Sequence, residues 1–295
     1  MKRCKLFIFI GLFFSILKTS SAQDLDKILD VEQPKVKEFV TATFKGTRLI
    51  NLHTVECVGK RGLDFRISHR FGSLNSGSNN AWGMDGPANI RLSLEYSFDG
   101  RTMFGIGRSS YQKMADAFLK FRLLRQTTNN SMPVSVTLFA SIYNNFISEK
   151  KVVPEDRRYN LYTNRLSYVD QIIIGRKFSS RFSLQIAPTF VHYNLVEKST
   201  DLNDIFLITG ATRIKFTKRQ AVTFEYCYRI NKYTIDKFYD SMSIGYEVET
   251  GGHVFQVHVT NSFGIADNQF LTGTNTSWET NGIRIGFNIS RVFTL

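Results

Sequence analysis

The sequence has few of the residues on which disulfide frameworks, zinc sites and compact catalytic motifs depend. Only 3 of its 295 residues are cysteine and 5 are proline. Cys4, Cys57 and Cys227 lie far apart, so no zinc-binding spacing is present and no disulfide can be predicted. The motifs HExxH, CxxC and GxSxG are absent as well, which removes the common sequence signals of metalloproteases, redox proteins and serine hydrolases.

Long hydrophobic runs are also missing, apart from one near the start. Residues 6–17 form an apolar run that follows the basic stretch 2–5 and precedes Ser20-Ser21-Ala22. This order predicts a secretory signal peptide over residues 1–22, with cleavage after Ala22. The alternative, a membrane anchor, is disfavoured because the run is shorter than the ~20 residues that a spanning helix needs. A protein with no other such run would enter a membrane as strands, not as helices.

The net charge is +13 at pH 7. Basic proteins often bind nucleic acid, but an exported chain seldom meets it, so anionic lipid headgroups or anionic solutes are the expected partners. No linker or low-complexity tract divides the chain, which predicts a single domain over residues 23–295.

What the sequence does contain is alternation of apolar and polar residues. In NIRLSLEYSF (89–98) and AVTFEYCYRI (221–230), every second residue is apolar over about ten positions. Period two is the signature of a β-strand with two different faces, and about ten residues is the strand length of a tilted membrane barrel. Asp99-Gly100 between two such segments is a strong hairpin signal.

We count roughly thirteen such segments after Ile50, and the connections between them alternate between short turns and longer loops. Long loops are expected at 72–87, 144–164 and 261–281, as in outer-membrane barrels with short periplasmic turns. The last strand would then end in the periplasm, and the first counted segment would start outside. Residues 38–50 would then bring the chain up, as one more strand that gives a total of about 14; if instead one strand was counted as two, the total is about 12. The prediction is an all-β, even-stranded antiparallel transmembrane β-barrel of roughly 12–14 strands. Residues 23–37 would be a short N-terminal periplasmic or lumenal segment.

Alternation does not say which face is outside, so a soluble secreted barrel is the competing architecture. The signal peptide, the loop asymmetry and the aromatic-rich apolar faces favour the membrane. The chain ends on an alternating strand, GIRIGFNISRVFTL. In this it resembles outer-membrane barrels, whose last strand carries an aromatic residue at or near its end that the assembly machinery recognises. Phe287, Phe293 and Leu295 are therefore the expected targeting residues, with barrel-assembly machinery as the partner.

Several stretches carry a resemblance to a known family. TFKGTRLIN (43–51), LDFRISHRFG (63–72), GMDGPANIRLSLEYSFDGRTMFGIGRSS (83–110), FLKFRLLRQ (118–126), MPVSV (132–136) and GFNISRVFTL (286–295) are similar to an uncharacterised β-barrel family of Gram-negative outer membranes, domain of unknown function 5777. The resemblance covers essentially the whole mature chain. It implies an outer-membrane barrel, and it implies no reaction and no site residues.

On the membrane interpretation, the polar faces line the lumen. The candidate lumen-lining residues are Asp64, Arg66, Arg70, Arg91, Glu95, Lys120, Arg122, Arg213, Lys215, Glu225, Arg229 and Arg284. Basic residues predominate among them, which would attract anionic solutes to an open pore. The alternative is a salt-bridged interior that passes nothing, and a barrel of this size is compatible with either.

Catalytic signals are weak. Ser68 and His69 are adjacent, so in a strand they face opposite sides and cannot form a dyad. The odd spacing of His253 and His258 likewise argues against a metal pair on one strand. GIGRSS (105–110) lacks the setting of a dinucleotide fingerprint and suits a strand whose glycines admit close neighbours.

The expected outer loops offer two further features. Asp201, Asp204 and Asp267 match no calcium motif and are expected to be solvated loop carboxylates. The loop 73–87 carries Trp82 and Met84 and is expected to be a surface loop.

Three functions are consistent with the sequence. The first is passive or gated passage of small solutes, with anionic ones as a hypothesis. The second is a plugged structural or interaction barrel that acts through its loops or N-terminal segment, and the third is a membrane-embedded hydrolase. We expect a monomer in the outer membrane of a Gram-negative bacterium, in contact with outer-membrane lipid, with no cofactor and no nucleic-acid partner.

Overall fold

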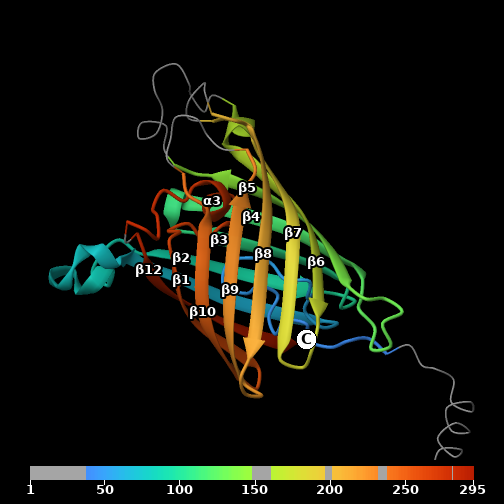
Figure 1. Cartoon of the computed structure of the whole chain (residues 1–295). Coiled ribbons are helices and arrows are strands. Elements are labelled where there is room, and N and C mark those ends of the chain that lie inside the picture. Colours follow the sequence, from blue (N-terminus) through green and yellow to red (C-terminus); the bar gives the residue numbers. More distant parts are fainter. Residues whose placement is uncertain (1–37, 148–160, 197–200, 232–237, 281) are drawn as a thin grey trace, which may run out of the picture. The chain divides into compact units, whose positions relative to one another are not determined.

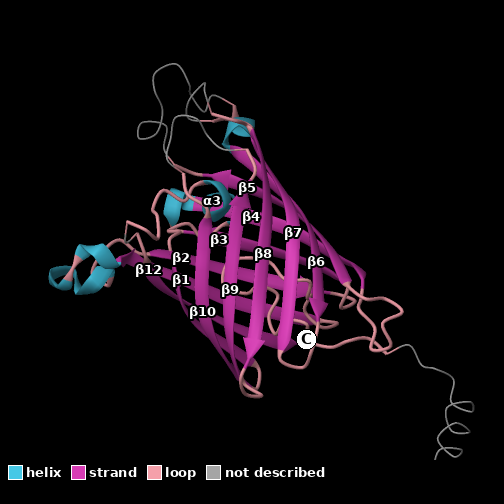
Figure 2. Ribbon diagram, viewed as in Figure 1, coloured by secondary structure: helices cyan, strands magenta, loops and turns pink. Residues whose placement is uncertain are grey.

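Twelve antiparallel strands close into a barrel (Figures 1 and 2). The computed structural model describes residues 38–147, 161–196, 201–231, 238–280 and 282–295. The strands are β1 Gly62–Ser73, β2 Asn89–Ser97, β3 Thr102–Ser109, β4 Met114–Leu124, β5 Ser135–Asn145, β6 Leu166–Lys177, β7 Phe182–Tyr193, β8 Asp204–Lys215, β9 Gln220–Arg229, β10 Ser241–Thr250, β11 His253–Thr260 and β12 Arg284–Thr294.

Each strand pairs with its neighbours along the chain, and β1 pairs with β12 to close the ring. Ile67 lies opposite Ile289 across this seam, and Gly62 lies opposite Thr294. The prediction of an even-stranded antiparallel barrel is confirmed, with twelve strands. Within the described ranges, no helix is long and apolar enough to cross a membrane.

The two faces of the barrel differ sharply in chemistry. On β2, Arg91 and Glu95 are buried, whereas Ile90, Leu92 and Leu94 are 41%, 47% and 44% exposed. The same arrangement recurs around the barrel, where large apolar side chains point outward from most strands. A soluble barrel would do the opposite, because exposing so large an apolar surface to water is unfavourable. An apolar outer face is the arrangement of a barrel that contacts lipid.

The predicted Asp-Gly hairpin turn joins β2 and β3. Gly100 has φ +77°, a left-handed conformation that glycine adopts without strain. The Asp99 carboxylate accepts hydrogen bonds from the backbone N–H of Arg101 (2.8 Å) and of Thr102 (2.6 Å). The hydrogen bonds from Thr102 and Arg101 lower the pKa of Asp99, because they stabilise its charged form.

The two ends of the barrel are unlike each other. The described parts of the connections 74–88, 146–165 and 261–283 lie at what we call the long-loop end, and the strand bounds confirm long connections at these places. The other end, the short-turn end, carries the turns 178–181 and 251–252. The chain enters the barrel wall at Gly62 and leaves it at Thr294, both at the short-turn end.

The path expected before the first strand is wrong. Residues 38–50 form no barrel strand, and the segment counted directly after Ile50 lies inside the barrel instead of in its wall. β1 therefore starts at the short-turn end, not outside. Alternation arises wherever an extended chain separates two environments, so it could not distinguish a wall strand from an extended segment inside the lumen.

The predicted signal peptide (1–22) and N-terminal segment (23–37) lie outside the described residues. The chain divides into a unit of residues 1–38 and a unit of residues 39–295, and the barrel with its contents belongs to the second unit.

Candidate functional site

The lumen contains a chain segment that we call the lumenal hairpin, residues 39–61. It begins at the short-turn end, where Val40 N–H donates to the carbonyl of Gln126 (2.8 Å). The chain then reverses at 49–52, where Leu49 N–H donates to the carbonyl of Leu52 (3.0 Å). It returns to Gly62 and enters β1, so the hairpin begins and ends at the same end of the barrel.

The tip of the lumenal hairpin is held by a carboxylate from the barrel wall. Glu225 on β9 accepts hydrogen bonds from the backbone N–H groups of Ile50 (2.8 Å), Asn51 (2.9 Å) and Leu52 (3.0 Å). From β12, the Asn288 amide donates to the carbonyl of Ile50 (2.8 Å). Hydrogen bonds to a charged acceptor are about twice as strong as neutral ones, so Glu225 is the main anchor of the tip.

One side of the lumenal hairpin is apolar and packs against an apolar part of the inner wall. Phe44, Leu49 and Leu52 are each 1% exposed. They belong to one cluster with wall residues of β3 to β9, namely Met103, Met114, Phe118, Phe139, Tyr143, Val169, Ile173, Ala187, Val191, Ile205, Leu207, Ala211 and Cys227. Burial of a large apolar side chain contributes about 1.5–3 kcal/mol, so this packing holds the hairpin firmly.

The structure buries ten of the twelve candidate lumen-lining residues. These are Asp64, Arg66, Arg70, Arg91, Glu95, Lys120, Arg122, Arg213, Glu225 and Arg229, whereas Lys215 and Arg284 are partly exposed. Arg91 forms a bidentate pair with Asp116, at 3.0 Å and 2.5 Å. Arg213 pairs with Glu247 (2.8 Å) and also with Glu249.

Acidic residues that the sequence analysis did not select balance the basic ones. Eight basic side chains are buried, Arg48, Arg66, Arg70, Arg91, Lys120, Arg122, Arg213 and Arg229, together with six acids, Asp64, Glu95, Asp116, Glu225, Glu247 and Asp267. The largely buried Glu56 and Glu249 add two more acids, and Glu56 pairs with Arg122 at 3.0 Å. Among these sixteen side chains the charges balance, whereas the partly exposed candidates Lys215 and Arg284, which are outside this count, are both basic.

Three further basic side chains, Lys120, Arg70 and Arg229, form hydrogen bonds with chain segments that lie inside the lumen. Lys120 donates to the carbonyls of Thr47 (3.1 Å) and Glu56 (2.6 Å), and Arg70 donates to the side chain of Asn51. Arg229 donates to the carbonyl of Thr272 (2.6 Å), in the second segment that enters the lumen. These cations bind the protein's own backbone and amides instead of facing an open pore.

The second lumenal segment is the short helix α3, Asp267–Thr272, in the connection between β11 and β12. All six of its residues are buried. Asp267 accepts hydrogen bonds from the Tyr143 hydroxyl (2.8 Å) and from Arg48 of the lumenal hairpin (3.2 Å). The expectation that Asp267 is a solvated loop carboxylate is therefore wrong, because the loop folds inward and Arg48, 219 positions away, pairs with it.

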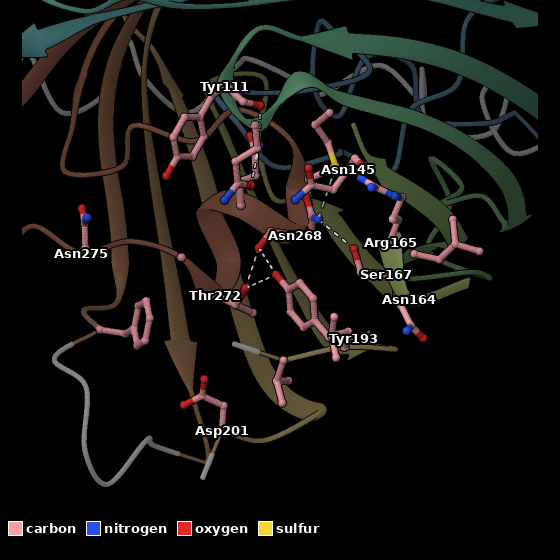
Figure 3. Close-up of a pocket in the computed structure, with 18 residues that line it drawn as sticks. Tyr111, Asn145, Asn164, Arg165, Ser167, Tyr193, Asp201, Asn268, Thr272 and Asn275 are labelled. Atoms are coloured by element: carbon pink, nitrogen blue, oxygen red, sulfur yellow. Dashed lines mark hydrogen bonds between the residues drawn. The ribbon is translucent and has the colours of Figure 1, made fainter. Parts of the chain in front are cut away.

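A cavity of about 470 Å³ opens beside α3 at the long-loop end (Figure 3). Its lining comes from α3, from the 3-10 helices η3 (Tyr111–Lys113) and η5 (Tyr162–Arg165), and from the ends of β5, β6 and β7. Figure 3 shows Tyr193, Asn268 and Thr272 joined by hydrogen bonds at its centre. Most lining groups are amides, hydroxyls and aromatic rings.

The structure does not bring Ser68 and His69 together as a nucleophile and its base. Ser68 is buried inside the barrel, and His69 lies on the other face, stacked on Phe287 with a ring-centroid distance of 5.0 Å. In the described part of the chain, no group of three or more His, Cys, Asp or Glu side chains could hold a metal ion. Trp82 and Met84 are 56% and 52% exposed in the loop after β1.

Two of the expected targeting residues, Phe287 and Phe293, lie on β12, and Leu295 directly follows it; Phe293 is 38% and Leu295 68% exposed. Phe287 is partly exposed on the outer face. Recognition by the assembly machinery stays a prediction.

The glycines of GIGRSS are close to inward-facing side chains, as the sequence indicated. A Cβ at Gly105 would lie 2.4 Å from the Phe118 ring, which also contacts His53 of the lumenal hairpin at a centroid distance of 4.8 Å. Gly105→Ala should therefore destabilise the barrel by about 1–3 kcal/mol, because a packed ring must move.

Gly210→Ala is the matched control for this prediction. The nearest atom to its added Cβ is 3.9 Å away, so stability should be unchanged or slightly higher. Urea unfolding of the two variants in detergent micelles measures both effects. Equal stability for both would contradict the assigned packing at Phe118.

A closed antiparallel barrel with an apolar outer face and a polar, filled interior defines a membrane-bound β-barrel protein. The chain belongs to the family described as membrane bound beta barrel domain (DUF5777), whose model matches residues 44–293. The match confirms the family expected from the sequence. No curated protein matches the sequence.

Among solved structures, the KdgM porin aligns over 79% of this chain and 99% of its own, with 9% identity and a TM-score of 0.47. Omp33 from Acinetobacter baumannii aligns over 79% and 99%, with 8% identity and a TM-score of 0.40. LpxR from Salmonella typhimurium aligns over 79% and 100%, with 10% identity and a TM-score of 0.38. These values are too low to transfer a substrate or an activity to this chain.

Proposed function

We propose that the protein is an outer-membrane barrel that is closed at rest and acts as a binding protein through its long-loop end. On this proposal the long-loop end faces the cell exterior and the short-turn end faces the periplasm, as in outer-membrane barrels generally. The carrying observation is the lumenal hairpin, whose tip gives three backbone N–H groups to Glu225.

Two further features support a resting state without a pore. The apolar side of the hairpin packs as tightly as a protein core, with Phe44 and Leu49 each 1% exposed. The buried charges form pairs or bind the lumenal segments, so they replace the water that would fill an open channel. A spontaneous exit of the hairpin would lose both sets of contacts at once.

Gated passage of small solutes is the second candidate, and the charged residues of the inner wall favour it. If the hairpin left, the described wall and α3 would present seven buried basic residues against six buried acids and Glu249. With the partly exposed Lys215 and Arg284 added, such a lumen would be weakly basic, so it would admit water and favour anions only slightly. The charge balance therefore gives no support to a strong preference for anions.

The hydrolase hypothesis has no supporting observation in the described residues, where Ser68 and His69 face opposite sides of the wall. The apolar outer face supports contact with outer-membrane lipid. One chain closes the barrel by itself, which fits a monomer.

Conductance of the refolded mature chain in a planar bilayer tests the proposal. We expect a folded, inserted protein to show no stable conductance steps at either polarity, because the hairpin and α3 fill the lumen. Regular steps from the unmodified protein would contradict the closed resting state and would favour a pore.

A further inference from the structure

The cavity beside α3 has the size and position of a small-molecule site. Its volume of about 470 Å³ lies in the range of ligand pockets. It is lined by several separate elements that only the folded barrel brings together, with Tyr111 and Gln112 from η3, Ser167 from β6 and Tyr193 from β7. The rigid strands and α3 would hold these groups in place before a ligand arrives.

The charge of the lining indicates a neutral ligand. Of the described residues that line the cavity, only Arg165 and Asp201 are charged, and they have opposite signs. Arg165 also donates to the carbonyls of Asn145 (3.1 Å) and Ile147 (2.8 Å), which ties its guanidinium to the protein. A strongly charged solute would find no excess of opposite charge here, so binding must come from hydrogen bonds and apolar contact.

The hydrogen-bonding groups are mostly ones that both donate and accept. Side-chain amides come from Gln112, Asn145, Asn164, Asn268, Gln269 and Asn275, and hydroxyls come from Tyr111, Ser167, Tyr193 and Thr272. A sugar hydroxyl also donates and accepts at one atom, so amides and hydroxyls are its natural partners. The rings of Tyr111, Tyr193 and Phe238 add apolar surface to the lining, which suits the C–H groups of a sugar ring.

One buried acceptor in this lining has no partner in the described residues. Asn268 is 1% exposed, and its Nδ2 donates to Ser167 (2.9 Å). Its Oδ1 is fully buried and accepts no hydrogen bond from any described residue. An unsatisfied buried acceptor is costly, and a ligand hydroxyl that donates to it would remove that cost.

From these observations we propose that the cavity is a binding site for a neutral polyhydroxylated solute of the sugar class, with the Asn268 Oδ1 as one of its acceptors. The proposal rests on the proposed function, since the cavity exists only while α3 lies in the lumen. It adds the chemical class of the ligand, which closure of the barrel alone does not specify.

The test is isothermal titration calorimetry on the full mature chain in detergent, with a panel of neutral sugars. Glucose, galactose, mannose, maltose, cellobiose and sucrose are the probes, and glucuronate and galacturonate are their charged counterparts. We expect at least one neutral sugar to bind with a Kd in the micromolar to millimolar range, and each acid to bind more weakly than its neutral parent.

Four variants locate the site. Asn268→Leu should weaken binding at least about tenfold, because it removes the buried acceptor. Asn164→Ala and Asn275→Ala should weaken it about two- to fivefold while leaving the fold intact, since neither side chain is needed by a strand. Asn79→Ala makes the same change at the long-loop end but outside the cavity, and it should bind as the unmodified chain does.

Three results would overturn the proposal. They are no binding of any neutral sugar at millimolar concentration, tighter binding of the acids, and equal binding by the Asn164, Asn275 and Asn79 variants. Conductance of the same preparation separates this proposal from the proposed function. A barrel that shows no conductance and binds no sugar would refute the binding site but not the closed resting state. A barrel that conducts and binds sugar would refute the closed resting state but not the binding site.

Discussion

Deletion of residues 39–58 is expected to turn a silent barrel into a conducting one. The deletion removes the lumenal hairpin but keeps every barrel strand, because β1 begins at Gly62. Phe44, Leu49 and Leu52 then no longer fill the space beside Phe118 and Phe139, and water can enter it. Planar-bilayer recordings should show discrete steps with little preference between anions and cations, because the remaining buried charges nearly balance.

Glu225→Gln is a subtler variant that keeps the whole chain. A glutamine side chain has about the same shape and can still accept at the Oε1 position, but it carries no negative charge, and its amide nitrogen at the Oε2 position would face the Asn51 N–H that now donates there. The tip should loosen, so brief openings should appear in recordings that are silent for the unmodified protein. Glu279→Gln makes the same change at an exposed outer-loop position and should stay silent.

The deletion variant must be shown to be folded before its conductance is interpreted. Electrophoretic mobility that changes on heating, together with the β-sheet circular dichroism of the unmodified chain, would establish this. A folded deletion variant that stays silent would show that the hairpin is not the block, and α3 with its loop would then be the remaining candidate.

The strands of the barrel wall could be predicted because alternate residues of each strand face two different environments, the lumen and the outside. Arg91 and Glu95 alternate with Ile90, Leu92 and Leu94, so ten residues suffice to show a strand with two faces. Turns such as Asp99-Gly100 are local too. Which face lies inside was left open by alternation, and the structure shows that the charged face does.

The contents of the lumen could not be predicted, because they depend on contacts between distant residues. Arg48 and Asp267 are 219 positions apart, and neither belongs to a recognisable motif. The part of the lumenal hairpin after Ile50 alternates like the wall strands and was therefore counted among them. The one usable signal was parity, since thirteen segments cannot close an antiparallel barrel that starts and ends at the same side.

The pairing of Arg91 with Asp116 shows the same limit at closer range. Arg91 lies on β2 and Asp116 on β4, with β3 between them. Gly107 of β3 pairs directly with Asp116, and a Cβ there would lie 2.3 Å from the Arg91 guanidinium. The missing side chain thus lets Arg91 cross β3 and reach its partner. Sequence reasoning selected Arg91 but not Asp116, because the role of Gly107 depends on strand register.

Asp116→Ala is expected to be among the most destabilising single substitutions in the barrel wall. Arg91 is 1% exposed and forms two hydrogen bonds with Asp116, so the variant leaves a buried guanidinium without its main partner. Breaking a buried ion pair from one side costs about 3–5 kcal/mol. The midpoint of urea unfolding in detergent micelles should fall accordingly, whereas Asp85→Ala at an exposed loop position should change stability by less than about 0.5 kcal/mol.

The double variant Arg91→Leu/Asp116→Ala, compared with Arg91→Leu and Asp116→Ala alone, separates the pair's own contribution from the cost of an unpaired charge. Replacing both partners of a buried pair by apolar residues of similar volume is often neutral or stabilising. We therefore expect the double variant to recover most of the stability that Asp116→Ala loses, with a coupling free energy of at least about 2 kcal/mol between the two sites. If the single and double variants lost equal stability, the packing around Gly107, and not the charge pair, would determine stability at this part of the wall.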